Sequence, residues 1–107
     1  MTVSRFARTA ALAALLLPLA AAAQDCSRPK TNTERLICSN DRVSEAHERM
    51  AVAFFMVYRR AMSDEQRGRI RKEQRDWETQ VRDVCMDIPC LLRSYEERTL
   101  ALDQSPQ

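Results

Sequence analysis

The sequence predicts a small all-α protein, an antiparallel helical bundle of one short and about three longer helices that is stapled by disulfide bonds. Three observations support this prediction. Glycine occurs only once, at Gly68, while Glu, Arg, Gln, Ala and Met, which favour helices, are abundant. Apolar residues recur at steps of three and four, the spacing of one helical face. Four cysteines in so short a chain indicate disulfide bonds, because a small core needs additional stabilisation.

Residues 1–23 are expected to form a cleavable secretory signal peptide. Arg5 and Arg8 give it a basic start, an apolar run of Ala and Leu follows, and three alanines precede Gln24. The apolar run is about a dozen residues long. Because a membrane-spanning helix needs about 20 residues, an uncleaved membrane anchor is the weaker alternative.

Cleavage after Ala23 would leave a single domain, residues 24–107, with no stable membrane anchor. A lipoprotein is not expected, because Gln24 and Asp25, rather than a small residue, precede Cys26. Removing the two arginines of the signal peptide reduces the 17 basic residues to 15, which equals the 15 acidic residues. This neutral domain has no excess positive charge to attract nucleic acid. Its expected location is the periplasm or the exterior of the cell.

The first two helices are expected soon after the cleavage site. Thr31 and Glu34 have the spacing of a capping box, which would begin a short helix through Cys38. That helix would be broken by the run of Ser39, Asn40 and Asp41, which can also cap a long helix over about residues 42–62. The expected inner face of this long helix consists of Val43, Ala46, Met50, Ala53, Phe54, Val57 and Ala61.

The second half of the domain is expected to contain two more helices. Ser63 and Gln66 form another capping box, and Gly68 should cost the helix that follows up to about 1 kcal/mol relative to Ala. The expected inner face of this helix consists of Ile70, Gln74, Trp77, Val81 and Val84. Pro89 suits the first turn of the last helix. The face of that helix is expected at Leu91, Tyr95, Arg98 and Leu102.

Cys26, Cys38, Cys85 and Cys90 allow three disulfide pairings. We favour Cys26–Cys38, which would tie the extended N-terminus to the first helix, and Cys85–Cys90, which would clamp the turn before the last helix. Structural zinc sites usually use cysteine pairs separated by about two to four residues. Only one of the two cysteine pairs approaches that spacing, and the expected compartment is oxidising. No metal and no other cofactor is therefore predicted.

No catalytic residue is predicted. His47 is the only histidine and lies in a charged helical stretch, so a packing or surface role is favoured over catalysis. Ser44 precedes it by three residues, but no oxyanion hole is evident beside this pair. Carboxylates alternate with Arg and Lys, as at Glu73 and Glu78, which indicates a solvated helix face with ion pairs. A hydrolase built on scattered carboxylates is the least favoured alternative.

The aromatic residues give the best candidates for contact with a protein partner. Trp77 and Tyr95 are expected in the core. Phe54 and Phe55 are adjacent, so they cannot both face the core from one helix. Exposed apolar groups beside charged residues suit a protein-binding surface. Phe55 and Tyr58 are the residues that one buried face explains least, and they are the candidate partner contacts.

The cysteines and several helix residues follow one another in a fairly specific order. The first group is Cys26, Glu34, Ile37 and Cys38, the second is Gln74, Arg75, Trp77 and Cys85, and the last is Cys90, Leu91, Tyr95, Arg98 and Leu102. This order resembles the LprI-like lysozyme-inhibitor domain family over nearly the whole of residues 24–107. The resemblance implies a helical, disulfide-bonded envelope protein that inhibits lysozyme. It implies structural roles for Glu34, Ile37, Gln74, Trp77, Tyr95 and Arg98.

The sequence departs from the family pattern at three positions. The family often has an acidic residue where His47 stands and a tyrosine near Phe54. It also often has an arginine four residues after the tryptophan, where this chain has Val81, with Arg82 next to it. These departures put the surface polar network in doubt and, with it, the identity of the partner.

The sequence favours two functions, and neither is catalytic. The first is a protein-binding inhibitor of lysozyme-type cell-wall hydrolases. The alternative is an envelope accessory, adaptor or immunity protein that binds another protein partner. Because lysozymes are often strongly cationic, a neutral inhibitor would need a local acidic patch. Such a patch is expected around Asp83 and Asp87, or around Glu96 and Glu97.

Overall fold

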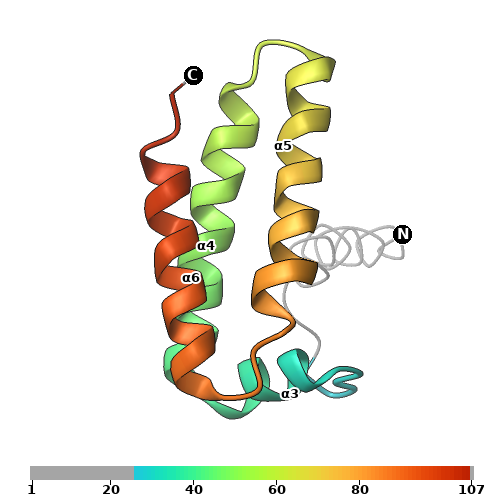
Figure 1. Cartoon of the computed structure of the whole chain (residues 1–107), viewed down its shortest axis with the longest axis vertical. Coiled ribbons are helices and arrows are strands. Elements are labelled where there is room, and N and C mark those ends of the chain that lie inside the picture. Colours follow the sequence, from blue (N-terminus) through green and yellow to red (C-terminus); the bar gives the residue numbers. More distant parts are fainter. Residues whose placement is uncertain (1–25, 107) are drawn as a thin grey trace, which may run out of the picture.

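Three long helices lie side by side, and a short helix crosses one end of them (Figure 1). The computed structural model describes residues 26–106, so the predicted signal peptide lies outside the described residues. The elements are α3 (Asn32–Ser39), α4 (Asp41–Arg60), α5 (Asp64–Trp77), the π-helical turn η2 (Glu78–Arg82) and α6 (Ile88–Asp103). The predicted all-α bundle is confirmed, with one short helix and three longer ones in residues 26–106.

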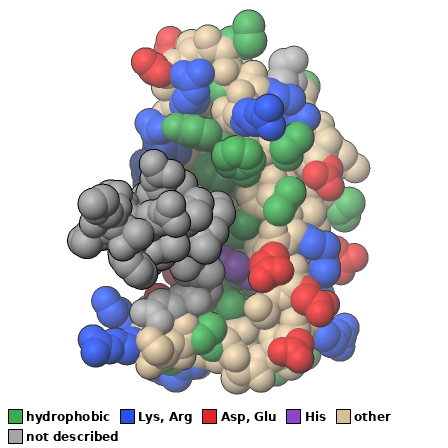
Figure 2. All heavy atoms as spheres, turned by 180° about the vertical axis from the view of Figure 1, so that it is seen from behind, with side chains coloured by type: hydrophobic (Ala, Val, Ile, Leu, Met, Phe, Trp, Pro, Cys, Tyr) green, Lys and Arg blue, Asp and Glu red, His purple; other side chains and the backbone are tan. Residues whose placement is uncertain are grey.

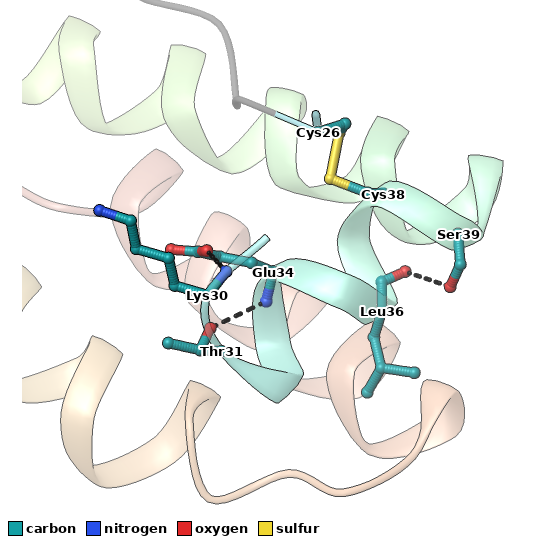
Figure 3. Close-up of a disulfide and its surroundings, with 7 residues drawn as sticks. All are labelled: Cys26, Lys30, Thr31, Glu34, Leu36, Cys38 and Ser39. Atoms are coloured by element: carbon teal, nitrogen blue, oxygen red, sulfur yellow. Dashed lines mark hydrogen bonds between the residues drawn. A yellow bond between two sulfur atoms is a disulfide. The ribbon is translucent and has the colours of Figure 1, made fainter. Parts of the chain in front are cut away.

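Each helix begins at a side chain that caps its free backbone N–H groups. Four N-cap residues accept a hydrogen bond from the N–H three residues later, at 2.9–3.1 Å: Thr31, Asn40, Ser63 and Asp87. In the two capping boxes, Glu34 and Gln66 also accept the N–H of the residue before the cap. The box at Thr31 is drawn in Figure 3. Each cap stabilises its helix by about 1 kcal/mol, which explains why the predicted helix starts are confirmed.

The path of the chain places α4 and α6 next to each other. The long helices α4, α5 and α6 alternate in direction along the sequence, as predicted, so α4 and α6 are parallel. These two parallel helices make the most extensive contact in the bundle, and the contact of α5 with α4 is less extensive. The core cluster contains Ile37, Val43, Ala46, Met50, Ala53, Val57, Trp77, Cys85, Leu91, Tyr95 and Leu102.

Both favoured disulfides are confirmed. Cys26 and Cys38 are bonded, with Cα atoms 5.4 Å apart, and tie the N-terminal segment to α3 (Figure 3). Cys85 and Cys90 are bonded, with Cα atoms 5.5 Å apart, and close the turn between η2 and α6. Loop-closure entropy gives roughly 3 kcal/mol for a loop of about a dozen residues and somewhat less for the shorter loop.

The prediction that Val81 and Val84 share the inner face of the third helix is wrong. Val81 is 41% exposed and Val84 is 63% exposed. The reason is η2, in which a backbone hydrogen bond joins residues five apart instead of four. This wider turn shifts every later side chain by about one position. Arg82 therefore points inward where Val81 was expected, and its side chain is 18% exposed.

No helix among residues 26–106 has both the length and the apolar character that a membrane crossing requires.

Candidate functional site

The six residues that the family resemblance singles out lie in two places. Glu34 completes the capping box of α3, and Ile37 is buried in the core one turn later. The other four, Gln74, Trp77, Tyr95 and Arg98, meet where the end of α5 packs against α6. All six therefore cap a helix, lie in the core or join two helices of the bundle.

Polar contacts surround the ring of Trp77. The guanidinium groups of Arg82 and Arg98 each lie 5.9 Å from its centroid, and the Tyr95 ring lies 5.6 Å from it. Arg98 Nε donates to Gln74 Oε1 at 3.0 Å. Cations over an indole face are attracted by its π electrons. This tryptophan cluster (Gln74, Trp77, Arg82, Tyr95 and Arg98) therefore joins α5, η2 and α6 through partly buried polar contacts.

His47 of α4 closes the tryptophan cluster from the other side. Its Nδ1 lies 3.0 Å from the hydroxyl of Tyr95, and the two rings meet edge to face. Burial lowers the pKa of His47, and the positive charge of Arg82 lowers it further, while Glu48 partly opposes this. Burial raises the pKa of Tyr95 to about 12. At neutral pH the contact thus joins an uncharged imidazole to an uncharged phenol, which suits packing.

The outward face of α4 differs from the tryptophan cluster because its large side chains face solvent. Val52, Phe55 and Met56 are 63%, 57% and 43% exposed, and their spacing places them together on one side of the helix. We call these three residues the apolar patch. On the face of the molecule shown in Figure 2, hydrophobic side chains gather in the upper half, and most acidic side chains lie on the right.

The two candidate partner contacts have different surroundings. Phe55 belongs to the apolar patch, whereas Tyr58 is half-buried on the side of α4 that faces α5. The Tyr58 ring lies 5.9 Å from the Phe54 ring, and the Arg71 guanidinium lies 5.6 Å from its centroid. Arg71 also donates a hydrogen bond to the Tyr58 hydroxyl. Tyr58 is therefore held within the fold, and Phe55 is the more accessible of the two.

A groove of about 580 Å³ runs beside the apolar patch, between α4 and the end of α6. Two members of the patch, Val52 and Met56, form its apolar floor together with Ala53. Its polar lining consists of Glu45, Glu48, Arg49, Thr99 and Asp103. We call this feature the α4–α6 groove.

Comparison with known proteins identifies the family. A family model described as lysozyme inhibitor LprI matches residues 23–102, which is most of the chain. The chain belongs to the LprI lysozyme-inhibitor family. No curated protein and no solved structure matches it. The LprI match confirms the resemblance given by the cysteines and helix residues.

The ion pairs of this LprI domain are unevenly distributed. Among the described residues, every ion pair lies on α5, η2 or the residue that follows: Arg67–Asp64, Arg69–Glu65, Lys72–Asp76, Arg82–Glu78 and Arg82–Asp83. The carboxylates of Glu45, Glu48 and Asp103 have no basic partner within 4 Å in residues 26–106. The α4–α6 groove therefore holds three exposed carboxylates that are not paired within the fold.

The acidic residues that the sequence suggested as a patch for a cationic partner do not line the α4–α6 groove. Asp83 is paired with Arg82 at 2.8 Å, and Asp87 caps α6, so both of these carboxylates already have partners within the fold. Glu96 lines the neighbouring end of the α4–α6 interface, and Glu97 is exposed.

The three groove carboxylates were missed in the sequence. Steps of three and four residues from Glu45 to Glu48 and Val52 could have placed these residues on one stripe of α4. The contribution of Asp103 could not be found in this way, because it depends on α6 lying parallel to α4.

In the described part of the chain, no group of three or more His, Cys, Asp or Glu side chains is arranged to hold a metal ion.

Proposed function

We propose that this protein is an exported inhibitor of lysozyme-type cell-wall hydrolases, and that it acts by binding the enzyme rather than by catalysis. The observation that supports this most strongly is the match of the lysozyme-inhibitor LprI family model to residues 23–102. The apolar patch on α4 gives this function a physical basis, because an inhibitor of this kind needs a surface that is more favourable in contact with protein than with water.

The proposed location follows from the N-terminal sequence and the disulfides. Residues 1–23 would direct export, and residues 24–107 would form the mature domain. Disulfides such as Cys26–Cys38 persist in oxidising compartments. The substrate of lysozyme is the cell wall, so an inhibitor must work outside the cytoplasm.

Phe55 is the proposed centre of the contact. Aromatic side chains that become fully buried at an interface often dominate the binding energy. Phe55 is exposed between Val52 and Met56 and supplies a large apolar surface at a low entropic cost. Tyr58 lies one turn farther along α4, and we place it at the edge of the same contact.

The test is a titration of purified, oxidised residues 24–107 into lysozymes of the different structural types, with residual cell-wall lysis as the readout. We expect activity to fall as the inhibitor approaches stoichiometric amounts with at least one type. A sample that is reduced and alkylated at its four cysteines is the matched control, and it should not inhibit. Absence of inhibition of every type at micromolar excess would contradict the proposal. It would leave an accessory, adaptor or immunity role with another protein partner.

A further inference from the structure

We propose that the α4–α6 groove binds a lysine or arginine side chain of the inhibited enzyme. This inference rests on the proposed function and specifies the chemistry of the partner. The partner would present a positively charged surface from which one long basic side chain reaches into the groove.

The floor of the groove suits the aliphatic part of such a side chain. Val52 and Met56 are exposed there, and Ala53 lines the groove beside them from a buried position. Lysine and arginine bury three or four methylene groups along apolar surfaces while their charged ends stay in polar surroundings. The floor could therefore cover the stem of a basic side chain without desolvating its charge.

The rim suits the charged end. Glu45 and Glu48 approach the groove from α4, and Asp103 approaches it from α6. Arg49 is the one basic residue in the lining, and its guanidinium is not within 4 Å of any carboxylate in the described residues. Three carboxylates and one guanidinium give the rim a formal charge of −2.

Charge decides among the occupants that an apolar floor alone would allow. A purely apolar side chain would remove water from the carboxylates without giving them a partner, and burying a charge in that way is costly. An acidic surface would be repelled. A basic side chain covers the floor and pairs with the rim at the same time, so charge complementarity favours it.

The groove also gives the neutral domain a way to attract a cationic enzyme. Association of charged proteins depends on local potential as well as on net charge. Three of the four carboxylates on α5 lie within 4 Å of an arginine or lysine, which cancels much of their field, whereas those of the groove have no basic partner within 4 Å in residues 26–106. The groove is therefore the part of this surface where a cationic partner would be steered.

The first experiment measures the affinity of residues 24–107 for a strongly cationic c-type lysozyme by calorimetry at low and moderate salt. We expect the variant E45Q/E48Q/D103N to bind at least about tenfold more weakly at low salt and to lose most of its salt dependence. The matched control E65Q/E73Q/D76N also loses three negative charges, but from α5, and its affinity should stay within about twofold of the original. Equal affinity of both variants would overturn the inference and leave the inhibitor function intact.

A second measurement tests the groove when the unmodified protein binds no lysozyme, which is the result that contradicts the proposed function. The probe is Nα-acetyl-arginine amide, compared with the uncharged citrulline analogue of the same shape, in an NMR titration of the oxidised domain. The arginine probe should shift the methyl resonances of Val52 and Met56, and the citrulline probe should not. Equal shifts with both probes, or no shift at these methyls, would overturn the inference.

Discussion

The outward faces of α4 and α5 are both exposed, yet they differ in whether their side chains have interaction partners within the protein. On α5, acidic and basic side chains three or four residues apart form pairs such as Arg67–Asp64 and Lys72–Asp76. On α4, the exposed face combines the apolar patch with carboxylates that have no basic partner in residues 26–106. The two faces belong to neighbouring helices of one small bundle, so compartment and solvent are the same for both.

This difference shows which surface has the most to gain from a partner. The paired charges of α5 are hydrated and contribute little free energy, so water satisfies that face. The apolar patch on α4 has no such solution, because exposed apolar area is stabilised only by being covered. The presence of charged residues alone does not distinguish the two helices, since each contains many of them. The pairing of the charges distinguishes them.

The largest expected effect is a loss of stability, which substitutions on the inner face of α4 should cause and those on its outer face should not. Met50 is buried in the core, while Met56 lies in the apolar patch. Met50→Ala should lower the free energy of unfolding by about 3 kcal/mol, because it removes buried atoms and leaves a cavity. Met56→Ala should change it by less than about 0.5 kcal/mol. Urea unfolding of both variants tests this, and similar losses would show that the outer face is also part of the core.

The next effect concerns binding. Phe55→Ser should weaken the inhibition of lysozyme at least about tenfold, because it removes the proposed anchor of the contact. The melting temperature should change little, since the side chain is exposed in the free protein. Arg69→Gln, on the outer face of α5, is the control and should leave inhibition unchanged. The opposite pattern, with a loss only in the α5 variant, would exchange the roles of the two faces.

The third effect is a pH dependence of stability, which we expect from the partly buried contact between His47 of α4 and Tyr95. Because burial lowers the pKa of His47 in the folded protein, the unfolded chain binds a proton more readily. The contribution of His47 to stability is therefore complete above its ordinary pKa of 6.5 and is lost as the pH falls from there through the lowered value. Unfolding free energies of the unmodified protein and of His47→Gln, measured between pH 7.5 and about 5, should show a weaker pH dependence in the variant. Parallel curves would contradict the buried, neutral imidazole.

A smaller change is expected within α5. A Cβ atom added at Gly68 would have no neighbour within 4 Å, and the residue has no positive φ. Gly68→Ala should therefore stabilise the protein by up to about 1 kcal/mol through helix propensity alone. Thermal unfolding measures this gain, and inhibition should not change. A loss of stability would show that the surroundings of α5 are tighter than the structure indicates.

The smallest effect is expected at the paired charges of α5. Lys72→Gln breaks the 2.8 Å pair with Asp76, which is exposed. The cost should be below about 0.5 kcal/mol at low salt and should decrease further as salt is added. Urea unfolding at two salt concentrations provides the measurement. A loss above about 1 kcal/mol would contradict the interpretation of this face as a hydrated surface and would show that the ion pair stabilises the fold.

Much of the fold could be predicted because its determinants are local. The caps at Thr31, Asn40 and Ser63 act over three residues, and both disulfides join positions close in the sequence. The π-helical turn was missed because nothing in a pattern of steps of three and four residues indicates one inserted residue. As a result, Val81 is predicted inside, whereas the structure exposes it and turns Arg82 inward.

The candidate site was only partly accessible to prediction. Phe55 could be selected because two adjacent aromatic residues cannot share one helical face. Tyr58 is a candidate because it lies off the predicted inner face of its helix, but its ring contacts Arg71 of α5 and Phe54. The groove needs Asp103, which lies more than 40 residues after Met56 in the chain, and the position of Asp103 depends on tertiary packing.

The central claim is that the outward face of α4 binds lysozyme and that of α5 does not. The most direct test is a titration of isotope-labelled residues 24–107 with an unlabelled c-type lysozyme, in which the backbone amide resonances are followed by NMR. We expect the largest shifts and broadening at residues 45–56 of α4 and near Asp103, with α5 residues 64–76 unchanged. Shifts concentrated on α5 and absent from α4 would contradict it.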